Sequence, residues 1–217
     1  MQRGQSPLAP LGARGSVPTA PEINRGIKMT RKEQKEERRK QILMTALTLF
    51  VERGYYETKI TDIAKAVPMS TGLMFHYFES KEELLLELVK MGVEGTKSVG
   101  QVPDIPADLY LTGFVKQLFS YAKEQPWVFN MFVFMGQVRR VGMPVEARKL
   151  AQSINTIETT AELIEKGQKD GVFREGDPKL LSSCFWAMVQ GIMEEMALNK
   201  EMEEPDPEWI IAMLKKG

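Results

Sequence analysis

The chain has 217 residues, no net charge at pH 7, and a composition of 43% hydrophobic and 27% charged residues. Such values are ordinary for a globular protein that buries a core. No apolar run approaches the roughly 20 residues that span a bilayer, and no signal-peptide pattern opens the sequence. We therefore expect a cytoplasmic protein without membrane contact, and the length suits a small domain joined to a larger one.

The zero net charge conceals an asymmetry between the two halves of the chain. Lys and Arg outnumber Asp and Glu by 15 to 11 in residues 1–90, whereas residues 91–217 hold 14 basic and 18 acidic residues. The basic excess is densest in residues 28–40, with seven basic and three acidic side chains. Such a run suits the phosphate backbone of a nucleic acid, although a mixed charge run is also typical of the solvated face of a helix.

The first 53 residues divide into an extension and a long helix. Residues 1–28 are rich in Gly, Pro and Ser and lack an apolar period, so we expect them to form a disordered N-terminal extension. A helical period follows from Thr30 to Arg53, and Gly54 is typical of a C-terminal stop.

Two shorter helices are expected next. The segment TKITDIAKAV (58–67) predicts a short helix with Thr58 as a possible N-cap, and Pro68 closes it. Ser70 can cap a third helix that runs to Phe78, with Met74 and Phe78 pointing inward. The SKEE motif at 80–83 is a capping box that starts a long, leucine-rich fourth helix.

Two short helices joined by a tight turn match a helix-turn-helix, whose second helix enters the major groove of DNA. Once Met74 and Phe78 are buried, the neighbouring side chains have no core to face, so we expect them to face DNA. Thr71 can bond a base edge and Leu73 can contact a thymine methyl. The remaining members of this set are Phe75, His76 and Tyr77, of which the last two can donate to phosphate oxygens.

Two residues of this segment have alternatives. Gly72 is costly inside a helix, which is reasonable if the backbone must approach the sugar-phosphate surface. The alternative for His76 is a buried, hydrogen-bonded core histidine. Because the chain has one histidine and one cysteine, far apart in sequence, we expect no metal site.

Residues 40–85 resemble the DNA-binding domain of the TetR family of bacterial transcriptional repressors, in their Gly-Tyr (54–55), DIA (62–64), S-x-G-x-x-x-x-YF (70–78) and SKEEL (80–84) features. The resemblance implies an all-α homodimer whose larger C-terminal domain binds a small molecule and thereby releases double-stranded DNA. It further implies DNA contacts from Lys59, Thr61, Thr71, Gly72, Leu73, Phe75, His76, Tyr77 and Lys81. The chain departs from the family pattern at Pro68-Met69 and at Phe75, which lacks the hydroxyl of the usual tyrosine.

The rest of the chain reads as further helices without strand alternation. Breaks at Pro and Gly residues divide it into helices at about 106–124, 126–140, 144–167, 178–199 and 207–216. We therefore expect an all-α protein with a helix-turn-helix domain at 29–79 and a ligand-binding and dimerisation domain at 80–217. The single cysteine, Cys184, lies in an apolar run and is expected to be a buried thiol.

Aromatic residues and methionines cover more than one helical face in residues 125–138. Such a helix is enclosed on several sides, either by plain core packing or by a cavity for an apolar ligand. The candidate cavity walls are Phe114, Tyr121, Phe129, Phe132, Met135 and Trp186.

The helix at 178–199 carries two apolar stripes, of which one can meet the core while the other needs a partner. Together with the last helix it predicts a two-helix face that pairs with a second copy into a four-helix bundle. The candidate interface residues are Val189, Met193, Trp209 and Met213. A two-fold dimer implies a pseudo-palindromic operator.

No catalytic constellation competes with this interpretation, since H-E-x-x-H, G-x-S-x-G and dinucleotide-binding motifs are missing from the sequence. We expect neither enzyme activity nor a cofactor. The predicted function is a ligand-responsive DNA-binding regulator, with repression as the default. The alternative is a helical protein-interaction module, which would lack the steep salt dependence of nucleic-acid binding.

Overall fold

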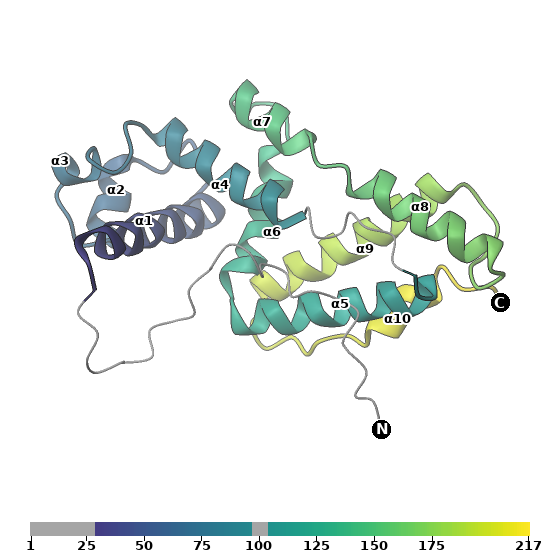
Figure 1. The fold of residues 1–217 in the computed structure, drawn as a ribbon. Coiled ribbons are helices and arrows are strands. Elements are labelled where there is room, and N and C mark those ends of the chain that lie inside the picture. Colours follow the sequence, from purple (N-terminus) through teal and green to yellow (C-terminus); the bar gives the residue numbers. More distant parts are fainter. Residues whose placement is uncertain (1–28, 97–103) are drawn as a thin grey trace. The chain divides into compact units, whose positions relative to one another are not determined.

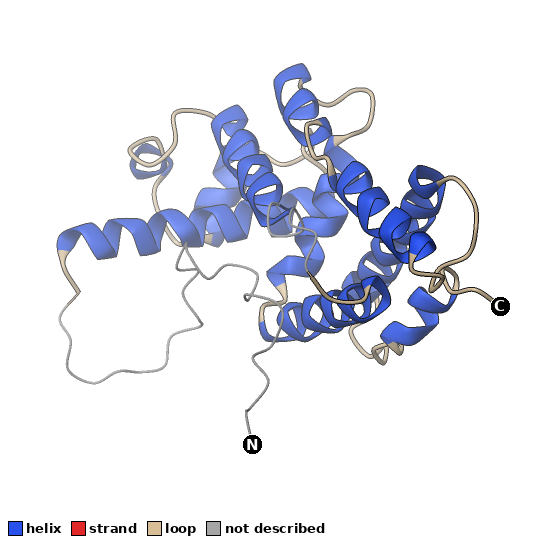
Figure 2. Cartoon of the chain, turned by 45° about the vertical axis from the view of Figure 1, so that its right-hand side comes forward, coloured by secondary structure: helices blue, strands red, loops and turns tan. Residues whose placement is uncertain are grey.

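The computed structural model describes residues 29–96 and 104–217. Within these ranges it contains ten α-helices and no strand, apart from an isolated bridge between Phe173 and Lys215 (Figure 1). Figure 2 shows helices joined only by loops, so the predicted all-α class is confirmed. The expected extension at 1–28 lies outside the described residues. Among the residues described, no helix has both the length and the apolar character needed to cross a membrane.

The described residues pack as two units. One unit comprises residues 29–94 and 130–153, and the other comprises 95–96, 104–129 and 154–217. The helices of the chain, in order, are α1 (Arg31–Arg53), α2 (Ile60–Ala66), α3 (Thr71–Met74), α4 (Lys81–Thr96), α5 (Ala107–Glu124), α6 (Trp127–Val138), α7 (Val145–Gln152), α8 (Thr156–Lys169), α9 (Pro178–Leu198) and α10 (Pro207–Ala212).

Helix α1 begins and ends where the sequence predicts, and local capping holds both ends. The Thr30 hydroxyl accepts from the Glu33 backbone N–H at 3.2 Å, and the Glu33 carboxylate accepts from the Thr30 N–H at 2.7 Å, which completes a capping box. At the other end Gly54 has a φ of 88°, in the region that favours glycine.

The predicted cap of α2 is wrong. Lys59, not Thr58, is the N-cap residue, and the Asp62 carboxylate accepts from its backbone N–H at 3.0 Å. Thr58 is fully buried, and its hydroxyl lies within hydrogen-bond distance of the carbonyl oxygens of Leu49 (3.2 Å) and Gly54 (2.8 Å). The Thr58 hydroxyl therefore bonds the C-terminal end of α1 and does not cap α2.

The third helix is shorter than predicted. Ser70 caps it, accepting from the Leu73 N–H at 3.1 Å, but the α-helix ends at Met74. A turn follows in which the His76 and Tyr77 N–H groups donate to carbonyls three residues back. Met74 and Phe78 are buried as predicted, and Gly72 lowers the helical propensity of so short a segment.

The capping box expected at the start of α4 is half formed. The Ser80 hydroxyl accepts from the Glu83 N–H at 3.1 Å, but the Glu83 carboxylate accepts from the N–H of Glu79. Helix α6 packs on α1 within the first unit. Phe134 of α6 stacks on Phe50 of α1 with ring centroids 6.3 Å apart.

The helix predicted at 144–167 is two helices, α7 and α8. Both the hydroxyl and the backbone N–H of Ser153 donate to the Leu150 carbonyl, at 2.7 and 3.1 Å. Such local bonding by serine competes with continued α-helix. The break divides the two units, since α7 packs in one and α8 in the other.

The second unit is built on α5, α8, α9 and α10. Helix α8 lies along α9, and α10 packs on α5 and α9 (Figure 1). Phe119, Phe173 and Phe185 are buried in its core. The ring of Phe173 packs directly against the backbone at Gly167 of α8, where a Cβ atom would lie only 2.2 Å from the ring. The burial predicted for Cys184 is wrong, since its side chain is exposed on α9.

Candidate nucleic-acid interface

The recognition segment, residues 70–78, presents large apolar side chains to solvent. Leu73 is 44% exposed and Phe75 is 50% exposed, whereas Met74 and Phe78 are buried. The Ser70 cap and the two buried anchors hold the segment in place. A cluster of exposed bulky residues on a short, anchored helix is more informative than a buried one, because such groups mark interaction surfaces.

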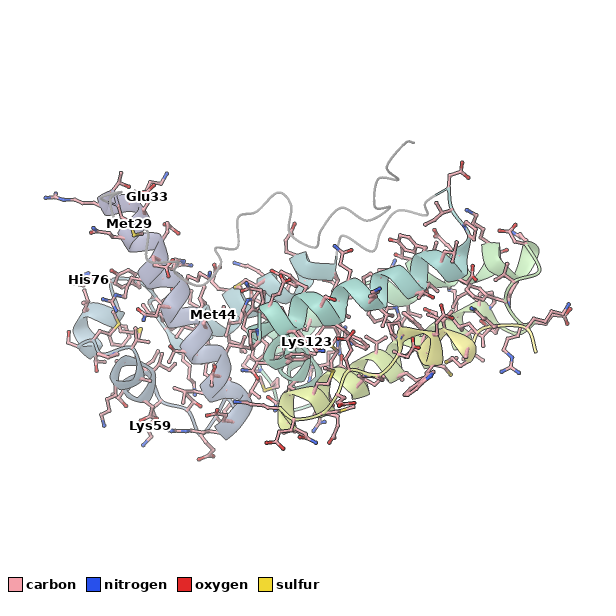
Figure 3. All side chains as sticks on the ribbon, turned by 90° about the horizontal axis from the view of Figure 1, so that it is seen from below. Met29, Glu33, Met44, Lys59, His76 and Lys123 are labelled. Atoms are coloured by element: carbon pink, nitrogen blue, oxygen red, sulfur yellow. The ribbon has the colours of Figure 1, made fainter. Side chains whose placement is uncertain are left out.

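Other predicted DNA contacts lie around this segment. Lys59 and Thr61, at the start of α2, are exposed, as are Gly72 and His76. Figure 3 shows His76 and Lys59 at the outer edge of the N-terminal helices. Thr71 and Tyr77 are half-buried. A Cβ atom on Gly72 would meet no other atom within 4 Å, so packing within the chain does not require glycine at this position.

Lys81 is held differently from the others. Its ammonium nitrogen donates to the carbonyl oxygens of Tyr55 at 2.9 Å and Thr58 at 3.0 Å. It also lies 4.3 Å from the centroid of the Tyr55 ring. Burial raises the pKa of the Tyr55 phenol, and the Glu82 carboxylate raises it further. Lys81 therefore fixes the loop before α2 with two of its three donors.

An open concavity brings a basic row of α1 beside the recognition segment. Its lining includes Arg31, Lys35 and Arg38, spaced four and three residues apart, and Tyr77 of the recognition segment. That spacing places the three cations on one helical face. The basic run at 28–40 is evident in the sequence, and the helical spacing of these three residues is the signal that distinguishes them within it.

The six candidate ligand residues do not fall in one unit. Phe114, Tyr121, Phe129 and Trp186 belong to the second unit, whereas Phe132 and Met135 belong to the first. The Phe114 and Trp186 rings meet edge to face at 5.8 Å, and the Trp186 indole N–H donates to the Thr160 hydroxyl at 3.0 Å. The cavity therefore stays a prediction.

The apolar stripe of α9 that the sequence pattern predicts as a dimer surface is part of the core. Val189 and Met193 are fully buried within one copy of the chain, so they offer no surface to a second copy. Trp209 is 70% exposed, and Met213 is half-buried. The exposed residues of α9 lie along another row, which is mostly apolar but includes two charged side chains: Lys179, Leu180, Cys184, Ala187, Met188, Gly191, Glu195 and Leu198.

The all-α fold, the capped recognition segment and the adjoining basic row define a helix-turn-helix protein of the DNA-binding class. Residues 42–88 match the family model "Bacterial regulatory proteins, tetR family". The N-terminal domain of this chain belongs to the TetR family.

Relatives extend the likeness beyond that domain. The chain is 44% identical over 165 residues to the uncharacterized HTH-type transcriptional regulator YuxN of Bacillus subtilis (strain 168), covering 73% of this chain and 53% of YuxN. Matches to the first curated relatives span only 24% to 53% of those proteins' lengths.

Solved structures show the same fold at lower identity. The MbdR regulator from Azoarcus sp. CIB superposes with a TM-score of 0.71 at 24% identity, covering 83% of this chain and 98% of MbdR. AibR, solved in complex with isovaleryl coenzyme A and operator DNA, superposes with a TM-score of 0.65 at 17% identity, covering 82% and 98%.

Proposed function

We propose that this protein is a ligand-responsive transcriptional regulator, acting as a repressor, that binds a pseudo-palindromic operator as a dimer. A mainly apolar small molecule releases it from DNA. The observation that carries the proposal is the exposure of Leu73 and Phe75 on a capped segment anchored by Met74 and Phe78. In functional terms, residues 29–79 bind DNA and residues 80–217 bind the ligand and the second copy.

The contacts divide into two kinds. Thr71 and Leu73 read base edges in the major groove, where a hydroxyl and an apolar side chain can discriminate bases. His76 and Tyr77 position the segment on phosphate oxygens, and so do Lys59 and Thr61 at the exposed start of α2. The basic row of Arg31, Lys35 and Arg38 extends the phosphate contact beyond the recognition segment.

The ligand response has a physical route within the first unit. A Cβ atom on Gly92 of α4 would lie 2.6 Å from the Met135 sulfur of α6, so the α4 backbone rests directly on a candidate ligand residue. A ligand that displaces Met135 moves α4, which leads directly into the recognition segment. It must bind the released state more tightly than the DNA-bound state, because equal affinity would shift no population. AibR was solved in complex with isovaleryl coenzyme A and operator DNA, so one protein of the same fold binds both a small molecule and DNA.

Dimerisation uses the solvent-facing row of α9. This row carries Leu180, Met188 and Leu198, with exposed fractions of 66%, 37% and 78%. Small residues between them, Ala187 and Gly191, permit a close approach of two helices. A second candidate function, a helical protein-interaction module, rests on this same exposed row.

The discriminating experiment is a selection of bound duplexes from a random pool, followed by band-shift titration of the selected site. The proposal predicts a pseudo-palindromic site whose affinity falls steeply with salt. Thr71→Ala weakens binding at particular base pairs by about 1–3 kcal/mol. A uniform loss on every sequence would show that Thr71 positions the segment and does not read bases.

A further inference from the structure

Arg39 joins three segments of the first unit. Its Nη1 donates to the carbonyl oxygen of Tyr77 at 2.9 Å, and its Nη2 donates to the Glu87 carboxylate at 2.9 Å. Its guanidinium carbon lies 4.2 Å from the centroid of the Phe78 ring. One side chain of α1 therefore contacts the end of the recognition segment and the middle of α4.

The contact with Tyr77 falls where the recognition segment has left the α-helical ladder. After Met74 the backbone continues as a turn with bonds to carbonyls three residues back. Holding the Tyr77 carbonyl fixes the end of this turn, and hence the direction in which His76 and Tyr77 project. Phe78, the next residue, is buried directly beneath the guanidinium.

Arginine suits this geometry because its two bonds come from different guanidinium nitrogens, Nη1 to the carbonyl and Nη2 to the carboxylate. A guanidinium is a planar fork that serves two acceptors at once, whereas an ammonium is a point charge on a flexible stem. Glu87 is also bonded by Lys90 at 2.9 Å. The hydrogen bonds from Lys90 and Arg39 lower the pKa of the Glu87 carboxyl, so the partner of Arg39 is ionised at neutral pH.

The neighbouring Arg38 provides a built-in contrast. Arg38 is exposed, lines the basic concavity beside Tyr77, and donates to Gln41 at 2.9 Å. The side chain of Arg39 is only 27% exposed. Consecutive helical residues point about 100° apart, so the two arginines lie on different faces of α1.

We propose that Arg39 is a positioning residue for DNA recognition: with Glu87 it holds the Tyr77 end of the recognition segment against α4 and does not itself contact DNA. This inference rests on the proposed function and adds to it the group that orients the reading surface. It predicts that Arg39 and Glu87 act as one unit on sequence discrimination, although Glu87 is a carboxylate that DNA would repel.

The test compares four variants of the full chain: Arg39→Lys, Glu87→Gln, their combination, and Arg38→Ala. Each is titrated against the selected duplex and a scrambled duplex over a range of salt concentrations. We expect Arg39→Lys and Glu87→Gln each to reduce the preference for the selected duplex by about tenfold, as for the loss of a charge-assisted hydrogen bond. The double variant loses no more of this preference than the more affected single variant, because the two substitutions remove the same bridge.

The salt dependence of binding distinguishes a positioning residue from a phosphate contact. Arg39→Lys keeps the logarithmic salt slope of the wild type, whereas Arg38→Ala reduces this slope by about one and weakens binding to both duplexes equally. Thermal melting shows whether a variant is folded. If Arg39→Lys unfolds, Glu87→Gln still tests the bridge from its other partner.

Three results would overturn the inference. The first is a salt slope that falls for Arg39→Lys as much as for Arg38→Ala. The second is an unchanged preference for the selected duplex in both single variants, and the third is a loss of preference in the double variant that equals the sum of the two single losses. If the wild type itself prefers no duplex, the proposed function fails as well. A wild type that discriminates, with variants that discriminate equally, overturns only the role of Arg39.

Discussion

The ammonium group of Lys81 donates a 3.0 Å hydrogen bond to the carbonyl oxygen of Thr58, and so ties the first residue of α4 to the residue before the N-cap of α2. The resemblance to the family implies a phosphate contact for this lysine. Its geometry instead gives it a structural task, because two carbonyls already accept from it.

Lys81→Met is therefore expected to lower the free energy of unfolding by about 1–3 kcal/mol, since two partly buried carbonyls lose their donor. Urea denaturation measures this loss, and Lys65→Met, at an exposed position of α2, is the matched control. If Lys81→Met keeps full stability while the salt slope of its DNA binding falls by about one, Lys81 contacts a phosphate and has no structural role.

Gly72→Ala separates folding from binding. The added methyl group meets no atom within 4 Å outside its own stretch of backbone, and alanine favours a helix over glycine by about 0.5–1 kcal/mol. We expect equal or higher thermal stability together with weaker DNA binding, because the methyl group occupies the space where the backbone approaches the sugar-phosphate surface. Unchanged affinity in a band shift would show that the DNA does not approach Gly72 closely.

Two substitutions on α9 distinguish the core from the interface. Met193→Glu buries a charge inside one copy, where the side chain is fully buried, and we expect it to destabilise the fold severely. Ala187→Glu places the charge on the exposed row and is expected to give folded monomers, as measured by analytical ultracentrifugation and circular dichroism. A dimer that persists in Ala187→Glu, with Lys200→Glu as the surface control, would locate the interface elsewhere.

Trp186 offers an optical signal for the ligand. Its ring lies between Phe114 and Phe185, with centroid distances of 5.8 and 5.4 Å, and the chain has three tryptophans. We expect apolar compounds to raise the melting temperature and to change the tryptophan emission. Trp186→Phe removes the emission change, whereas Trp209→Phe keeps it. Stabilisation by charged or sugar-like compounds alone would contradict the predicted apolar ligand.

Local signals in the sequence predicted some helix ends, such as the Ser70 cap and the Gly54 stop, but not the ends of α3, α7 and α10. The Ser70 cap and the Gly54 stop depend on residues within one turn of each other, so they can be predicted without knowing the fold. The Thr58 cap failed because its hydroxyl bonds carbonyls of the preceding helix. No pattern near Thr58 reveals this competition.

The face that α9 buries could not be predicted in the same way. Both of its rows are apolar, so periodicity alone does not say which one meets α8. Val189 and Met193 proved to be core, and Cys184 proved to be exposed. Arg39 was missed for a similar reason: its partners lie 38 and 48 residues away in sequence, and a basic run does not distinguish a bridging arginine from a phosphate contact.

Quantitative band shifts on the selected duplex at several salt concentrations measure whether the exposed recognition segment reads DNA. We expect a preference of at least about a thousandfold over scrambled duplex and an affinity that falls steeply and linearly in logarithmic salt. Binding that shows no preference for any duplex, or that is insensitive to salt, would contradict this expectation.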